Sequence, residues 1–171
     1  WNAPSGIAAH KAASALAAGC PVLLKPSEWA PMSAQLMTEA AASVGLPEGM
    51  WQLLHGDAVV GEALTRDARV RAVSFTGGLQ GGRAVAAACA DGIKPAQLEL
   101  GGNNPLVVLE DANLDQAADG VVTALITLNG QWCRALGRLL VHSTVCDELL
   151  DRVYQRLVSV RLGNAMNPES Q

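Results

Sequence analysis

The chain has 171 residues, of which 50% are hydrophobic and 16% are charged, a composition typical of a folded globular protein and not of a disordered one. Its formal net charge of -4 at pH 7 argues against a surface that binds nucleic acid or an anionic membrane. Its apolar runs are too short to span a bilayer, so we expect no membrane partner.

Helical patterns and short apolar runs alternate along the chain, and Gly19 and Gly45-Leu46-Pro47 mark two of the boundaries. In chain order the patterns predict a helix over 6–18, a strand over 21–25, a helix over 31–44, a strand over 51–54, a helix over 58–66, a strand over 71–75, a helix over 80–90, strands over 96–100 and 105–109, a helix opening at 113–116, a strand over 139–142 and a helix over 144–160. This alternation predicts an α/β fold with a doubly wound, mostly parallel sheet and helices on both faces.

The helix that opens at 113–116 has the clearest start signal. Asn113 stands at the N-cap position of a capping-box pattern that ends at Gln116. Apolar residues then recur every three or four positions as far as Leu128, which indicates one buried helix face.

The four cysteines form no C-x-x-C pair and no Cys/His cluster with zinc spacing, so we expect no metal site. Reduced thiols and a cytoplasmic location fit a chain without a secretory segment. Because the sequence starts at Trp1 without an initiator Met and ends in loop-like composition, we expect it to be a piece of a longer protein.

Two motifs suggest a mechanism. Glu99 ends an apolar run just before Gly101 and Gly102, and Cys133 follows Gly130, which ends a helical pattern. A carboxylate that activates water and a thiol that attacks a carbonyl are the equipment for covalent acyl chemistry. Taken alone, a cysteine such as Cys133 is more often a buried structural residue.

Polar residues and glycines follow two of the predicted strands, where open α/β sheets bind their ligands. Lys25 and Glu28 follow the first strand and suit the hydroxyls of a ribose. The turn Thr76-Gly77-Gly78 suits a phosphate held by backbone N–H groups at a helix start. The alternative for both segments is local, a helix cap and a simple turn, and the chain has no G-x-G-x-x-G fingerprint.

Together these motifs resemble one family, the aldehyde dehydrogenase superfamily. The resemblance covers essentially the whole chain and rests on seven segments in order: Trp1-Asn2-Ala3-Pro4, Lys25-Pro26-Ser27-Glu28, Gly45-Leu46-Pro47, Phe75-Thr76-Gly77-Gly78, Leu98-Glu99-Leu100-Gly101-Gly102, Asp111-Ala112-Asn113-Leu114-Asp115 and Gly130-Gln131-Trp132-Cys133. It implies that residues 1–100 are part of a Rossmann-like NAD(P)-binding domain and that 101–171 begin a second α/β domain, which bears the thiol.

The resemblance also implies roles in the oxidation of an aldehyde to a carboxylic acid. Cys133 would be the nucleophile, which forms a thiohemiacetal and then a thioester. The side-chain amide of Asn2 and the backbone N–H of Cys133 would hold the oxyanion, and Glu99 would activate the water that hydrolyses the thioester. Trp132, beside the thiol, would line the substrate tunnel and hints at a bulky or aromatic aldehyde.

The implied cofactor is NAD, with NADP possible. Its implied contacts are Trp1, Lys25, Ser27, Glu28, Gly77, Gly78 and Leu100. Lys25 and Glu28 would contact the adenosine ribose, and a carboxylate there would repel the 2′-phosphate of NADP. The full-length protein is expected to be a homodimer or homotetramer.

The chain departs from the family pattern at two positions: Gly78 stands where Ser is common, and Asn103 where Lys is common. Two other functions remain as alternatives, acyl transfer to coenzyme A and a non-catalytic, structural or cofactor-binding role. Because family members are much longer, we expect residues 1–171 alone to show weak or no turnover.

Overall fold

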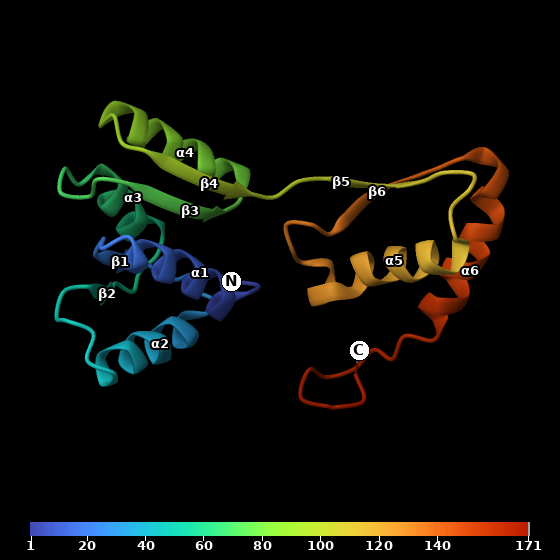
Figure 1. Ribbon diagram of the computed structural model, residues 1–171, viewed down its shortest axis with the longest axis horizontal. Coiled ribbons are helices and arrows are strands. Elements are labelled where there is room, and N and C mark those ends of the chain that lie inside the picture. The colour runs from blue at the N-terminus through green and yellow to red at the C-terminus, as the bar shows by residue number, and fades with distance from the viewer. Residues whose placement is uncertain (171) are drawn as a thin grey trace. The chain divides into compact units, whose positions relative to one another are not determined.

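A computed structural model describes residues 1–170 of the chain. These form two compact units, Trp1–Leu100 and a second unit that begins at Gly101 (Figure 1). Within residues 1–170, no helix combines the length and the apolar character needed to cross a bilayer.

The first unit alternates helices and strands. Its elements are α1 (Pro4–Ala17), β1 (Val22–Leu24), α2 (Pro31–Ser43), β2 (Trp51–Leu53), α3 (Ala58–Arg66), β3 (Val73–Gly77), α4 (Leu79–Asp91) and β4 (Ala96–Leu100). Strand β1 pairs with β2, and β3 pairs with β4, both in parallel (Figure 1). A helix joins the two strands of each pair, as a parallel connection requires.

Local sequence explains where the first two helices start and stop. Pro4 and Pro31 occupy the first helical turn, where a missing N–H costs nothing. Gly19 and Gly45, with φ of +74° and +84°, follow the two helix ends. This left-handed backbone is the conformation that glycine adopts most readily.

The second unit repeats the strand–helix–strand plan. Its elements are β5 (Asn104–Val108), α5 (Leu114–Ile126), the 3-10 helix η1 (Thr127–Gly130), β6 (Leu136–Val141), a second 3-10 helix η2 (Ser143–Val145) and α6 (Cys146–Val158). Strand β5 pairs with β6 in parallel, with a register irregularity between Asn104 and Pro105. The Asn113 side chain accepts hydrogen bonds from the N–H groups of Asp115 and Gln116, both at 3.1 Å, which confirms the predicted cap.

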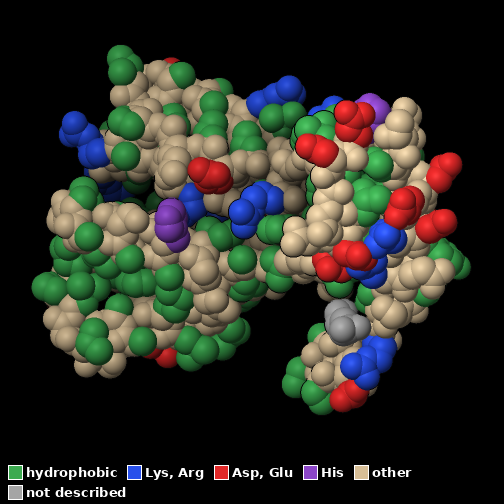
Figure 2. Space-filling view, turned by 45° about the vertical axis from the view of Figure 1, so that its right-hand side comes forward, with side chains coloured by type: hydrophobic (Ala, Val, Ile, Leu, Met, Phe, Trp, Pro, Cys, Tyr) green, Lys and Arg blue, Asp and Glu red, His purple; other side chains and the backbone are tan. Residues whose placement is uncertain are grey.

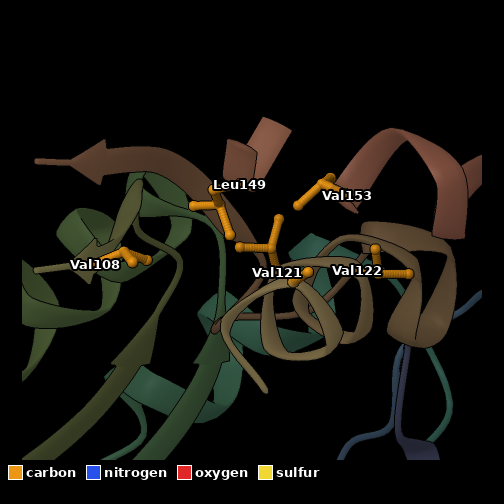
Figure 3. Close-up of a cluster of buried hydrophobic side chains, with 6 residues drawn as sticks. Val108, Val121, Val122, Leu149 and Val153 are labelled. Carbon is orange, nitrogen blue, oxygen red and sulfur yellow. The ribbon is translucent and has the colours of Figure 1, made fainter. Parts of the chain in front are cut away.

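The core of the second unit joins β5, α5 and α6. Its buried members are Val108, Ala118, Val121, Val122, Leu149 and Val153. Figure 3 shows Val121 of α5 and Leu149 of α6 pointing toward one another. Each large aliphatic side chain buried in this way stabilises the unit by about 1.5–3 kcal/mol.

Charged side chains join the exposed edges of α5 and α6. Asp115 of α5 pairs with Arg152 and Arg156 of α6, at 2.6 and 2.9 Å. Their hydrogen bonds hold the pKa of Asp115 below its usual value. Acidic and basic side chains lie beside one another on this part of the surface (Figure 2).

The predicted α/β class with parallel strands is confirmed, and several predicted boundaries are wrong by a few residues. The strand predicted at 71–75 lies at Val73–Gly77, and the strand predicted at 139–142 begins at Leu136. Pairing with the neighbouring strand, and not apolarity, sets these ends. The helix predicted over 144–160 begins at Cys146, because residues 143–145 form a separate 3-10 turn.

Candidate functional site

Lys25 joins the loops that follow β1 and β2. Its Nζ donates hydrogen bonds to the carbonyl oxygens of Pro26 and Gly56, both at 2.8 Å. Its aliphatic stem lies against Gly61, where an added Cβ would be 3.5 Å from Cε of the lysine. The Lys25 ammonium therefore holds the two loops at a fixed separation.

A hollow of about 480 Å³ lies between these loops and the start of α2. Its lining residues are Pro26, Ser27, Glu28, Pro31, Met32, Gln35, His55 and Gly56. Proline and methionine side chains give it apolar walls, and Ser27 and Glu28 add polar groups at its edge. The Ser27 hydroxyl also accepts a hydrogen bond from the Trp29 N–H at 3.3 Å. This bond stabilises the turn before α2 and does not cap the helix, whose N-cap is Ala30 without a side-chain hydrogen bond.

The turn between β3 and α4 contains Gly77 and Gly78. A Cβ on Gly77 would lie 2.5 Å from Cζ of Phe75, so this position has no room for a side chain. Gly78 is the N-cap of the 13-residue helix α4, and a Cβ there would meet no atom within 4 Å. The helix start is therefore open, with N–H groups that suit an anion.

Leu100 ends β4 and packs against this same helix. An added Cβ on Gly82 of α4 would lie 2.6 Å from Cδ2 of Leu100. The leucine side chain is thus occupied in fixing α4 on β4.

Glu99 lies one residue earlier on β4, opposite Thr76 of β3, and its side chain is exposed. Lys11 of α1 reaches this part of the pair and donates a hydrogen bond to the Ser74 hydroxyl. Partial burial lowers the pKa of Lys11, while the negative charge of Glu99 acts to raise it. Sequence reasoning missed Lys11, although a lysine within an Ala-rich helix was a visible signal.

Cys133 lies in a tight turn of the second unit and is exposed. The N–H of Ala135 donates to the carbonyl oxygen of Trp132 at 3.1 Å and closes this turn. The Asn104 side-chain amide donates to the carbonyl oxygens of Cys133 and Ala135, at 2.8 and 3.1 Å. Asn104, which sequence reasoning also missed, therefore holds the turn from β5.

The backbone before the cysteine is left-handed over three successive residues. Leu128, Asn129 and Gly130 have φ of 50°, 56° and 70°. This conformation costs about 1–2 kcal/mol for a residue with a Cβ, and such strain concentrates at functional sites. The helix predicted to continue to Leu128 thus ends at Ile126, and the chain reverses toward Cys133.

The remaining sequence-predicted residues precede α1. Trp1 is exposed and Asn2 is partly buried. The first unit therefore contains every predicted cofactor contact together with Asn2 and Glu99, and the second unit contains the thiol. Lys25, Ser27 and Glu28 lie in the segment that follows β1.

Comparison with known proteins identifies the relatives of this chain. A model of the aldehyde dehydrogenase family matches residues 1–171. A glutarate-semialdehyde dehydrogenase of Pseudomonas aeruginosa is 40% identical over 167 residues, which are 97% of this chain and 35% of that protein. A betaine aldehyde dehydrogenase of Cereibacter sphaeroides is 39% identical over 171 residues, 100% of this chain and 35% of that protein.

The fold is also that of solved structures. The crystal structure of an NADP-dependent enzyme of E. coli superposes with a TM-score of 0.97 at 37% identity, covering 99% of this chain and 36% of that one. The chain thus spans about 35% of the length of the curated relatives it matches.

Proposed function

Because this chain belongs to the aldehyde dehydrogenase family, we propose that it carries the thiol and the water-activating carboxylate of an NAD(P)-dependent aldehyde dehydrogenase. One observation carries the proposal: Cys133 is exposed on a turn that Asn104 holds by two hydrogen bonds. A buried thiol would be inert, whereas an accessible one on a fixed turn suits a nucleophile.

In the proposed reaction the Cys133 thiolate attacks the aldehyde carbon. A carbon–sulfur bond forms, and the carbonyl π electrons move to the oxygen. The Asn2 amide and the Cys133 backbone N–H donate hydrogen bonds to this oxyanion, each worth ~2.7–4 kcal/mol in the transition state. When bound, NAD(P)+ supplies the acceptor for the hydride that leaves the same carbon, and Cys133 then carries a thioester.

Glu99 completes the proposed cycle. Its carboxylate takes a proton from water as the water oxygen attacks the thioester carbon. The carbon–sulfur bond breaks, the thiolate leaves and the carboxylic acid is released.

The first unit offers a fitting place for the cofactor. The hollow beside Ser27 and Glu28 suits the adenosine end, and the open turn at Gly78 lets phosphate oxygens approach the N-terminus of α4. Lys25, Gly77, Trp1 and Leu100 complete the proposed contacts. Since the carboxylate of Glu28 would repel a 2′-phosphate, we favour NAD over NADP.

Aldehyde oxidation and the two alternatives make different predictions for the full-length protein. With an aldehyde and NAD, wild type should produce NADH without coenzyme A, and Cys133→Ala should abolish this. Glu99→Gln should release one burst of NADH and then stall at the thioester. Cys20→Ala removes another exposed thiol and should leave turnover unchanged.

The contrary outcomes are equally clear. Full turnover by Cys133→Ala would rule out the thiol mechanism. Turnover only with coenzyme A would indicate acyl transfer, and no turnover with any aldehyde would indicate a non-catalytic protein.

We also propose that the full-length protein is cytoplasmic and forms a homodimer or homotetramer. All four cysteines are free, which suits a reducing compartment. Sedimentation equilibrium of the full-length protein would measure its oligomeric state.

A further inference from the structure

Arg134, the residue after the candidate nucleophile, has an exposed side chain that stacks on an aromatic ring. Its guanidinium carbon lies 5.0 Å from the centroid of the Trp132 ring. Trp132 is held in turn, because its indole N–H donates to the carbonyl oxygen of Ala124 at 3.5 Å. Stacking on an aromatic face uses the flat surface of a guanidinium and leaves its N–H groups free to donate.

The Arg134 guanidinium is without a bonded partner among residues 1–170, unlike those of the other arginines in the second unit. Those four bond to a carboxylate or a carbonyl oxygen: Arg138 to Asn103, Arg152 to Glu148, Arg156 to Asp119 and Arg161 to Glu169. The Arg134 guanidinium has no hydrogen bond or ion pair with any residue from 1 to 170. Its five donors are available to a ligand.

The turn places this cation next to the thiol. Cys133 and Arg134 are the two central residues of the turn that the Trp132–Ala135 hydrogen bond closes. Consecutive α-carbons are about 3.8 Å apart, so the Arg134 backbone lies beside that of Cys133. The Arg134 side chain is exposed and stacks on Trp132, and it would have to turn toward the sulfur to meet a molecule bonded there.

We infer that Arg134 binds an anionic group of the substrate, and that the preferred aldehydes carry a carboxylate at the far end of a short chain. This inference rests on the proposed function and adds the charge of the substrate to it. A guanidinium donates two parallel hydrogen bonds to a carboxylate, a geometry that a neutral or cationic aldehyde does not offer. Arg134 would act by binding, since it exchanges no proton or electron with the substrate.

The test compares aldehydes of one chain length in the full-length protein. The probes are 5-oxopentanoate, which carries a carboxylate, and pentanal, which is neutral. Wild type should have a kcat/KM about tenfold higher for 5-oxopentanoate, equivalent to ~1.4 kcal/mol. Arg134→Gln should lower kcat/KM for 5-oxopentanoate to the level of pentanal, chiefly through KM, and leave pentanal within about twofold.

Two further variants separate binding from a general effect of charge or folding. Arg134→Lys keeps the charge but loses the paired donors, and should retain part of the preference. Arg138→Gln removes a nearby arginine that is bonded to Asn103 and should leave the preference unchanged. Betaine aldehyde, a cation, should become a better substrate of Arg134→Gln than of wild type.

Two results would overturn the inference. One is a wild type without preference for the carboxylate, and the other is an equal loss for both aldehydes in Arg134→Gln. Turnover of both aldehydes without discrimination would leave the proposed function intact. Absence of turnover with all three probes would overturn this inference, whereas the proposed function is overturned only if no aldehyde of any class is turned over.

Discussion

Removal of the Asn104 side chain should alter the reactivity of the Cys133 thiol without unfolding the protein. Asn104→Ala deletes two hydrogen bonds to the turn that bears Cys133. Each neutral hydrogen bond contributes ~0.5–1.5 kcal/mol, so the turn should lose ~1–3 kcal/mol of local stability. Asn104→Asp should be worse, because it also places a carboxylate against two carbonyl oxygens.

The consequence is expected in reactivity. A displacement of the reacting atom by about 1 Å can cost roughly a hundredfold in rate, so we expect kcat of the full-length protein to fall at least about tenfold. In Asn104→Ala, the rate at which iodoacetamide alkylates Cys133 should differ from that of wild type, while KM for NAD stays near the wild-type value.

A neighbouring asparagine provides the control. Asn103 directly precedes Asn104, but its side chain lies against Gly137 of β6. Asn103→Ala should therefore keep the wild-type rate of alkylation. If Asn104→Ala reacted and turned over as wild type does, the turn would not depend on this side chain and the reasoning would be refuted.

Two further predictions concern stability. Gly130→Ala should destabilise the second unit by ~1–2 kcal/mol, because φ is +70° and the new Cβ would lie 3.1 Å from a backbone oxygen of α5. Gly120→Ala lies within α5, where a new Cβ would meet no atom within 4 Å, and should stabilise the unit by up to ~1 kcal/mol. Thermal unfolding of the two variants would measure both changes. Asp115→Asn should destabilise the folded protein at pH 7. Since the pKa of Asp115 is lower in the folded state than in the unfolded state, the ionised carboxylate stabilises the fold above the unfolded pKa of about 3.9, and this stabilisation is lost as pH falls through the folded pKa. Denaturant unfolding from pH 7 to 2 should thus show the two proteins converging in acid, and a constant difference would contradict the ion-pair account.

The sequence predicted element types better than element ends. The strand at 96–100 was predicted with its observed bounds, since its apolar run and its pairing with β3 coincide. At β6 they do not coincide. Gly137 and Arg138 interrupt the apolar run, yet the ladder with β5 begins at Leu136. Strand limits depend on a partner elsewhere in the chain, which a local pattern does not contain.

The same physical reason explains which residues of the candidate site were missed. Cys133 and Glu99 lie within local motifs, so the sequence alone singled them out as candidates. Asn104 bonds to a residue 29 positions away, and Lys11 bonds to one 63 positions away. Their roles exist only after β5 meets the cysteine turn and Lys11 of α1 reaches Ser74 of β3. Supporting groups of this kind orient reactive ones, so they become visible when separate elements pack together, whereas the proposed reactive groups are visible in the motifs themselves.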